Sequence, residues 1–107
     1  MEKRNDLRSG SRPCVVIQNN MGNNFSPMTI VAPLTGSDQY KKLPVQVLVT
    51  AAELGFVNSK ESTVECGHLR AIDRDLRIKA CRGTLDANAM TRVDRAIAIS
   101  VGLQSST

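Results

Sequence analysis

The stretch CVVIQNNMGNNFSPMTIVAPL, residues 14–34, decides the fold because it places two strand patterns on either side of one long polar segment. Cys14–Gln18 and Met28–Leu34 are rich in β-branched residues, which favour strands. The segment 19–27 is dense in Asn, Gly, Ser and Pro, which are typical of loops. This stretch therefore predicts two strands joined by a long connection.

More strand patterns follow toward the C-terminus. From 45 to 50, valine occupies every second position, which fits a half-buried strand. Ser62–Cys66 and His68–Ile72 indicate two further strands interrupted at Gly67, and Ile78–Cys81 indicates another. The chain is therefore expected to be mainly β.

Only the last segment has a convincing helical pattern. Asp86 is suited to cap its N-terminus and Gly102 to end it. Between them, apolar residues recur at spacings of three and four, at Met90, Val93, Ile97 and Val101. The sequence therefore predicts a small twisted, barrel-like sheet covered by one C-terminal helix.

Length and composition bound the class of protein. The 107 residues, 41% of them hydrophobic, suit a single soluble domain spanning 1–107, with residues 1–9 expected to be a flexible or atypical terminus. We expect a cytoplasmic protein with reduced cysteines, because the three cysteines form an odd set and no membrane span or export signal is visible. The net charge of +4 is only a weak indication of a polyanionic partner.

Several ordered segments resemble toxins of the MazF/PemK family. Gly10–Asn19 is similar to the Gly-x-Arg-Pro strand opening of these toxins, and the other matching segments are Asn23–Pro27, Ile30–Thr35, Lys42–Pro44, His68–Asp73 and Val93–Ile97. The resemblance implies an SH3-like small β-barrel (MazF/Kid/CcdB-like) with a terminal helix. It also implies a homodimeric toxin of a toxin–antitoxin pair, which cleaves single-stranded RNA at short motifs and reaches DNA only through the antitoxin complex.

The resemblance assigns the catalytic pair to Arg12 and Thr35. Two departures from the family pattern stand out. Only nine residues precede Gly10, so the first family strand is expected to be missing or replaced, and the loop positions usually held by Glu and Gln fall on Leu7 and Arg8. A base-reading Gln of the family is replaced by His68, so the cutting specificity is not simply inherited.

The chemistry implied is metal-free attack of a ribose 2′-hydroxyl on phosphorus, which leaves a 2′,3′-cyclic phosphate and a 5′-hydroxyl. A guanidinium can grip two phosphate oxygens, which suits Arg12, and the Thr35 hydroxyl can bond a phosphoryl oxygen. Arginine is a poor base, so His68 is an alternative proton carrier, because histidine titrates near neutral pH. We expect no metal and no cofactor; the expected substrate-binding residues are Arg8, Gln18, Phe25, His68 and Arg70.

Two other functions stay open at this point. The short N-terminus and the absent Glu could leave a catalytically weak MazF-like subunit that binds an antitoxin or nucleic acid. A CcdB-like gyrase poison is a third alternative, against which the motifs around Arg12 and Thr35 argue.

Overall fold

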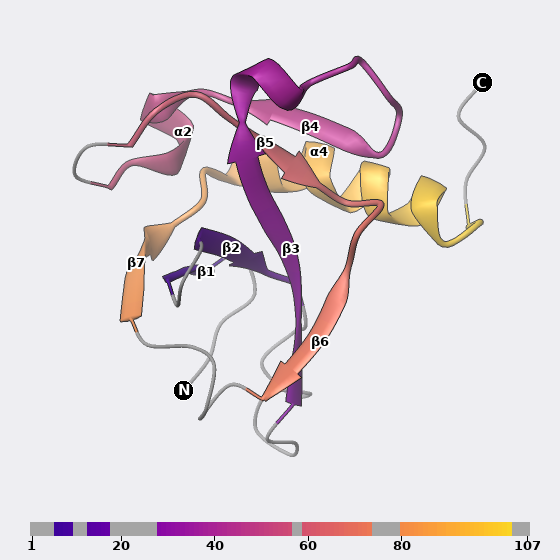
Figure 1. The fold of residues 1–107 in the computed structure, drawn as a ribbon, viewed down its shortest axis with the longest axis horizontal. Helices are drawn as coiled ribbons and strands as arrows, with labels where there is room; N and C mark the ends of the chain where they lie inside the picture. The colour runs from indigo at the N-terminus through magenta and orange to yellow at the C-terminus, as the bar shows by residue number, and fades with distance from the viewer. Residues whose placement is uncertain (1–5, 10–12, 18–27, 57–58, 74–79, 104–107) are drawn as a thin grey trace.

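The computed structural model describes residues 6–9, 13–17, 28–56, 59–73 and 80–103, which form a twisted antiparallel sheet and a C-terminal helix (Figure 1). The strands are β1 (Asp6–Ser9), β2 (Pro13–Val16), β3 (Met28–Gly36), β4 (Gln46–Val49), β5 (Ser62–Glu65), β6 (Arg70–Asp73) and β7 (Ala80–Thr84). The helical segments are η1 (Ser37–Gln39), α2 (Ala51–Leu54) and α4 (Ala87–Ser100). None of these helices has the length and apolar character needed to cross a bilayer.

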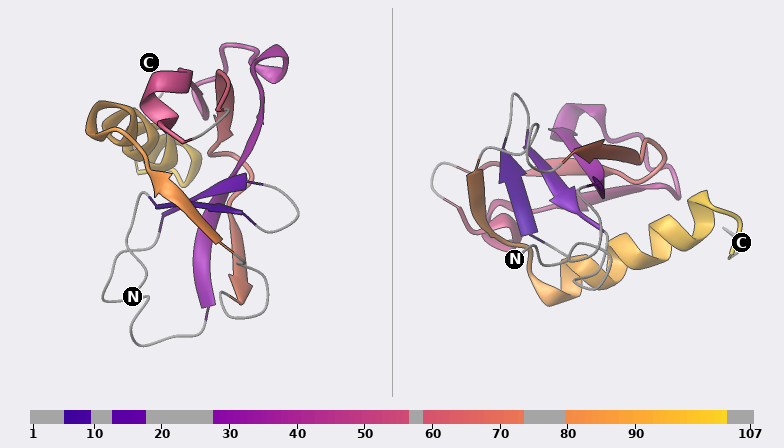
Figure 2. Two further views of the ribbon diagram at one scale, coloured as in Figure 1. Left: turned by 90° about the vertical axis from the view of Figure 1, so that its left-hand side faces the viewer. Right: turned by 90° about the horizontal axis from the view of Figure 1, so that it is seen from below.

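The long strand β3 organises the sheet. The strand order is β4-β5-β3-β2-β1-β7, and β6 also pairs with β3. The first part of β3 pairs with β2 and β6, whereas its last three residues, 34–36, pair with β5. Figure 2 shows the resulting strong twist, with β1, β2 and β7 running across β3. Within the described residues no pairing joins β4 to β7, so the sheet is not closed, while the mainly β fold with a C-terminal helix is as expected.

A short strand occupies the place where the first family strand was expected to be missing or replaced. β1 lies between β2 and β7 and pairs antiparallel with both. Leu7 lies opposite Val15, and Arg8 lies opposite Cys14 and Cys81. Asp6–Ser9, expected to belong to a flexible or atypical terminus, thus extend the sheet beyond β2. This strand could not be predicted from the sequence, because four residues with one apolar side chain show no period.

Two later strands are displaced from their expected bounds. The strand expected at His68–Ile72 begins at Arg70, because the His68 amide donates to the Glu65 carbonyl (3.1 Å) and holds residues 66–68 in a turn. The strand expected at Ile78–Cys81 is β7, Ala80–Thr84. The pattern therefore predicted the strands correctly but not their ends.

Helix α4 closes the main core, as expected. The Asp86 carboxylate caps it by accepting from the amides of Asn88 (3.0 Å) and Ala89 (3.4 Å). Its buried residues pack with side chains from β2, β3, β4 and β5, and they are Ala89, Met90, Val93 and Ala96. Ile97 packs at the margin of this core, but Val101 is 56% exposed because it follows the last helical turn. The expectation that Val101 belongs to the buried face was therefore wrong.

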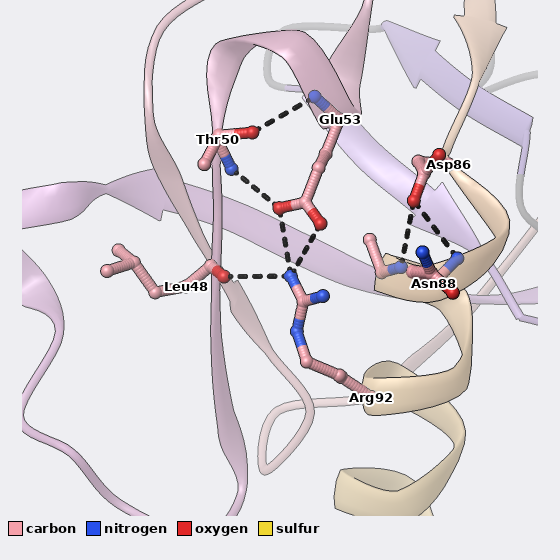
Figure 3. Close-up of polar contacts among 7 residues, drawn as sticks. Leu48, Thr50, Glu53, Asp86, Asn88 and Arg92 are labelled. Atoms are coloured by element: carbon pink, nitrogen blue, oxygen red, sulfur yellow. Dashed lines mark hydrogen bonds and ion pairs between the residues drawn. The ribbon is translucent and has the colours of Figure 1, made fainter.

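A polar network ties α2, β4 and α4 together (Figure 3). The Thr50 hydroxyl accepts from the Glu53 amide (3.1 Å), and the Thr50 amide donates to Glu53 Oε1 (3.0 Å), so two of the open donors at the start of α2 are satisfied. Arg92 Nη2 of α4 donates to both Glu53 carboxylate oxygens at 2.9 Å and to the Leu48 carbonyl at 3.3 Å. One guanidinium thus joins three elements.

Candidate active site

Thr35 lies near the end of β3 at the wall of a cavity of about 540 Å³. Its side chain is half-buried, and the neighbouring Leu34 points into the core on the opposite face of the strand. The cavity is also lined by Pro13 at the start of β2, by Asp38 of η1 and by Lys60 before β5. The end of β3 therefore borders an open space that is lined by charged groups of both signs.

The Thr35 hydroxyl is held by a buried carboxylate. Thr35 Oγ1 donates to Glu65 Oε2 at 2.8 Å, and Glu65 is only 8% exposed. The strand register explains the contact: Thr35 lies opposite Thr63 and Gln46 lies opposite Glu65. Opposite residues share a face, as do residues two apart, so all four lie on one face of the β3-β5-β4 sheet. The other face carries the apolar core.

Gln46 completes this polar face. Its Nε2 donates to Glu65 Oε1 (3.1 Å), to Glu65 Oε2 (3.2 Å) and to the Gln39 carbonyl (3.0 Å). Its Oε1 accepts from the Lys41 amide at 2.8 Å. The loop after η1 is thus fastened over the sheet by a side chain that also supports Glu65.

Arg70 and His68 lie near this face. Arg70, in β6, is exposed and lies directly opposite Val31, four residues before Thr35 on β3. It therefore shares a face with Thr35, and the four residues of strand from Val31 to Thr35 span about 13 Å. His68 is exposed in the turn between β5 and β6, three residues after Glu65. The structure thus places Arg70 on the face of Thr35 and His68 in the exposed turn that follows β5.

The other expected site residues are described only in part. Arg12, Gln18 and Phe25 lie outside the described residues. The backbone of Arg8 is described as part of β1, but its side chain is not. Thr35 is therefore the only one of the expected catalytic pair that the structure describes.

Cys14 and Cys66, the cysteines whose side chains the structure describes, are buried, and no disulfide joins them. Cys66 is fully buried, and burial, followed by the nearby carboxylates of Glu65 and Asp94, raises the pKa of its thiol to about 12. The thiol faces the Val93 carbonyl at 3.9 Å. Cys66 is therefore a protonated core residue, not a nucleophile.

Glu65 and Gln46 were missed by the sequence analysis. Glu65 ends β5 between the apolar residues Val64 and Cys66, and Gln46 begins β4 between Val45 and Val47. Charged residues are almost never buried unless they are paired, so such a position is a usable indication of a polar network. Its partner in β3, however, depends on a register that the sequence does not show.

Comparison with known proteins identifies the family. Residues 2–101 match the family described as PemK-like, MazF-like toxin of type II toxin–antitoxin system. The chain is 40% identical over 96 residues to Endoribonuclease EndoA of Bacillus subtilis (strain 168), a match that covers 90% of this chain and 80% of the relative.

Solved structures share the fold at lower identity. An endoribonuclease in complex with its cognate antitoxin from a mycobacterial species superposes with a TM-score of 0.81 at 16% identity, covering 97% of this chain and 98% of that chain. A MazE–MazF structure from Deinococcus radiodurans gives a TM-score of 0.78 at 19% identity, covering 96% of this chain and 98% of that chain. With the family match over nearly its whole length, the chain belongs to the PemK-like, MazF-like toxins of type II toxin–antitoxin systems.

Proposed function

We propose that this toxin is an endoribonuclease that cuts single-stranded RNA at short sequence motifs without a metal ion, with Arg12 and Thr35 as its catalytic pair. One observation carries the assignment of the site. Thr35 and Pro13 line the same cavity, and Pro13 is bonded directly to Arg12. Because Arg12 directly precedes Pro13 in the sequence, we propose that Arg12 and Thr35 act together at this cavity.

The reaction proposed needs no water as reactant. The ribose 2′-oxygen bonds to phosphorus while the bond from phosphorus to the 5′-oxygen breaks, which gives a 2′,3′-cyclic phosphate and a 5′-hydroxyl. The Arg12 guanidinium holds two phosphate oxygens and stabilises their added charge. The 2′-hydroxyl loses one proton and the 5′-oxygen gains one, a transfer proposed for Arg12, with His68 as the alternative carrier.

RNA would follow the face that carries Thr35. Arg70 stands on this face about 13 Å of strand from the level of Thr35, a position suited to contact a phosphate other than the one that is cut. His68 is exposed beside this path and is proposed to read a base edge. Arg8, Gln18 and Phe25 complete the proposed substrate-binding set, with Phe25 as a stacking surface for a base.

The proposed biological setting is cytoplasmic. The matched solved structures include toxins crystallised with an antitoxin, which supports a cognate antitoxin as the partner of this chain. We propose a homodimer, with DNA contacted only through the antitoxin complex. The mass of the purified protein in solution tests the dimer, and a strictly monomeric species at micromolar concentration would contradict it.

The test of the activity is direct. Purified protein is incubated with long single-stranded RNA and excess chelator, and the new ends are mapped for cyclic phosphate and 5′-hydroxyl groups. We expect cleavage by the parent protein, none by Arg12→Ala, and parental cleavage by Arg95→Ala, which removes the same charge from an exposed site on α4. A folded parent protein that leaves RNA intact would overturn the proposal and favour the catalytically weak, antitoxin-binding subunit.

A further inference from the structure

Glu65 is a buried carboxylate that the proposed chemistry does not yet use. It stands on β5 with 8% of its surface exposed, and removing a charge from water is costly unless hydrogen bonds compensate. Among the described residues its side chain accepts hydrogen bonds from Thr35 and Gln46. One of these two partners is the proposed catalytic threonine.

The direction of the hydrogen bonds can be read from the backbone outward. The Lys41 amide can only donate, so the Gln46 atom that it contacts at 2.8 Å is the amide oxygen. The Gln46 nitrogen is therefore the atom that faces the Gln39 carbonyl and Glu65. Because an amide nitrogen can only donate hydrogen bonds, Glu65 accepts from Gln46.

The same reasoning applies to Thr35. In the 2.8 Å contact the Thr35 hydroxyl is the donor and Glu65 Oε2 the acceptor. A threonine hydroxyl has one proton. While this proton is hydrogen-bonded to Glu65, the oxygen has only lone pairs left, and it can act only as an acceptor toward a bound molecule.

An acceptor matches only one of the reacting groups. The non-bridging oxygens of a phosphate are themselves acceptors, so they are poorly matched to Thr35 in this state. The attacking 2′-hydroxyl of the ribose is a donor. Before attack, a hydrogen bond from the 2′-hydroxyl to Thr35 Oγ1 would hold the 2′-oxygen with its lone pairs available for phosphorus. As the bond to phosphorus forms, the proton of the 2′-hydroxyl passes to the proposed carrier, Arg12 or His68, and Thr35 keeps its own proton.

We infer that Glu65 is a positioning residue that holds the Thr35 hydroxyl as the hydrogen-bond acceptor for the attacking 2′-hydroxyl of the RNA. The inference rests on the proposed function and revises one part of it, since Thr35 was expected to bond a phosphoryl oxygen. It also gives Gln46 a purpose, because Gln46 keeps Glu65 in the accepting orientation and is itself fixed by the loop after η1.

Glu65→Gln is the informative substitution because it exchanges donor and acceptor in the hydrogen bond between Thr35 and residue 65. The Gln46 nitrogen needs an acceptor, so the new side chain turns its oxygen to Gln46 and its amide nitrogen to Thr35. The Thr35 hydroxyl then accepts from residue 65, and its own proton becomes available to a bound molecule. We expect kcat to fall about 100-fold, the size of effect known for misplaced reacting groups, while KM changes less than about twofold.

A double-mutant cycle separates positioning from a structural role. In a Thr35→Val background, Glu65→Gln should change kcat by less than about twofold, because the hydroxyl through which it acts is gone. In a Thr35→Ser background the loss should return. Glu53→Gln removes the same charge outside the cavity and serves as the control. Independent, multiplicative losses from Glu65→Gln and Thr35→Val would overturn the inference.

A binding measurement tests whether Thr35 accepts a hydrogen bond from the 2′ position without altering Glu65. It keeps the inference testable if Glu65→Gln does not fold. Once the cut site is mapped, two RNA oligonucleotides are made that carry a 2′-amino or a 2′-fluoro group at the attacking position. The neutral amine donates and the fluorine cannot, so the parent should bind the amino form about 3- to 10-fold more tightly, and Thr35→Val should bind both equally.

Different results would refute the proposed function and the proposed role of Glu65. A parent protein that does not cleave RNA refutes the proposed function. A parent that cleaves RNA but binds the amino and fluoro oligonucleotides equally refutes only the role of Glu65 and Thr35 stated here.

Discussion

Substitutions of Glu53 should destabilise the fold through two separable effects, loss of the helix cap and loss of the ion pair with Arg92. It closes the capping box of α2 through the Thr50 amide, and it accepts from Arg92 of α4 through both carboxylate oxygens. Glu53→Ala removes both interactions. Glu53→Gln keeps an oxygen for the Thr50 amide but removes the charge that attracts Arg92, because glutamine also serves at this position of a capping box.

The expected magnitudes follow from these contacts. Loss of a helix cap costs about 1 kcal/mol. The Arg92 side chain is 45% exposed and that of Glu53 19%, so water screens the ion pair and its loss costs about 0.5 kcal/mol. Glu53→Ala should therefore lower the free energy of unfolding by about 1.5 kcal/mol, and Glu53→Gln by about 0.5 kcal/mol. For a domain of this size, each kcal/mol shifts Tm by about 4–8 °C.

The pH dependence provides a second measurement. The hydrogen bonds from Arg92, and then from the Thr50 amide, lower the pKa of Glu53 below its ordinary value of 4.5. A carboxyl group with a lowered pKa in the folded state stabilises the fold above the pKa of the unfolded chain, and this contribution is lost as the pH falls through the folded-state pKa. The stability difference between parent and Glu53→Gln should thus be constant near neutrality and disappear in acid.

Thermal unfolding followed by circular dichroism checks these expectations at neutral and at acidic pH. Glu61→Ala, a change at an exposed carboxylate just before β5, is the control and should alter stability by no more than about 0.5 kcal/mol. The reasoning is refuted if Glu53→Ala is no less stable than Glu61→Ala, or if the difference between parent and Glu53→Gln persists unchanged in acid.

The remaining predictions concern the site and the core. Arg12→Lys should cleave RNA nearly as poorly as Arg12→Ala in a gel assay, because a point charge cannot make the two-pronged phosphate contact. His68→Gln should change the mapped cut sites more than the maximal rate; a collapsed rate that loses its pH dependence near neutrality would instead make His68 a proton carrier. Leu54→Ala should cost about 2–5 kcal/mol in chemical denaturation, since Leu54 is 1% exposed. Cys66, whose thiol pKa is raised to about 12, should react with iodoacetamide only after unfolding, as followed by mass spectrometry.

The sequence predicts the elements in which apolar side chains recur at a regular spacing. Valine at alternate positions identified β4, and the three- and four-residue spacing identified α4 and its cap at Asp86, because each pattern reflects one buried face. Residues 6–9 and α2 were missed for the same reason. Each has only four residues, too few for a period, and each depends on partners distant in sequence.

The site was only partly visible in the sequence. Thr35 came from its place in a family motif, but its partner Glu65 is 30 positions away and contacts it only because β5 pairs with the last residues of β3. A register shift of one residue would turn Glu65 to the apolar face. The contact between Thr35 and Glu65 therefore depends on how β3 and β5 pair. The sequence pattern of neither strand predicts that pairing.

That pairing also explains why a charge is tolerated in the middle of the sheet. The apolar face of β3, β5 and β4 faces the core, so the opposite face is free to carry Thr35, Thr63, Glu65 and Gln46. Thr63 is itself fully buried and donates to the Gly36 carbonyl at 3.1 Å, so a neutral polar residue next to Glu65 is satisfied as well. An apolar residue at 65 could fill the same space, but it would leave the Gln46 amide and the Thr35 hydroxyl without their acceptor. The buried carboxylate thus contributes orientation rather than packing, and its effect should be measured in kcat more than in Tm.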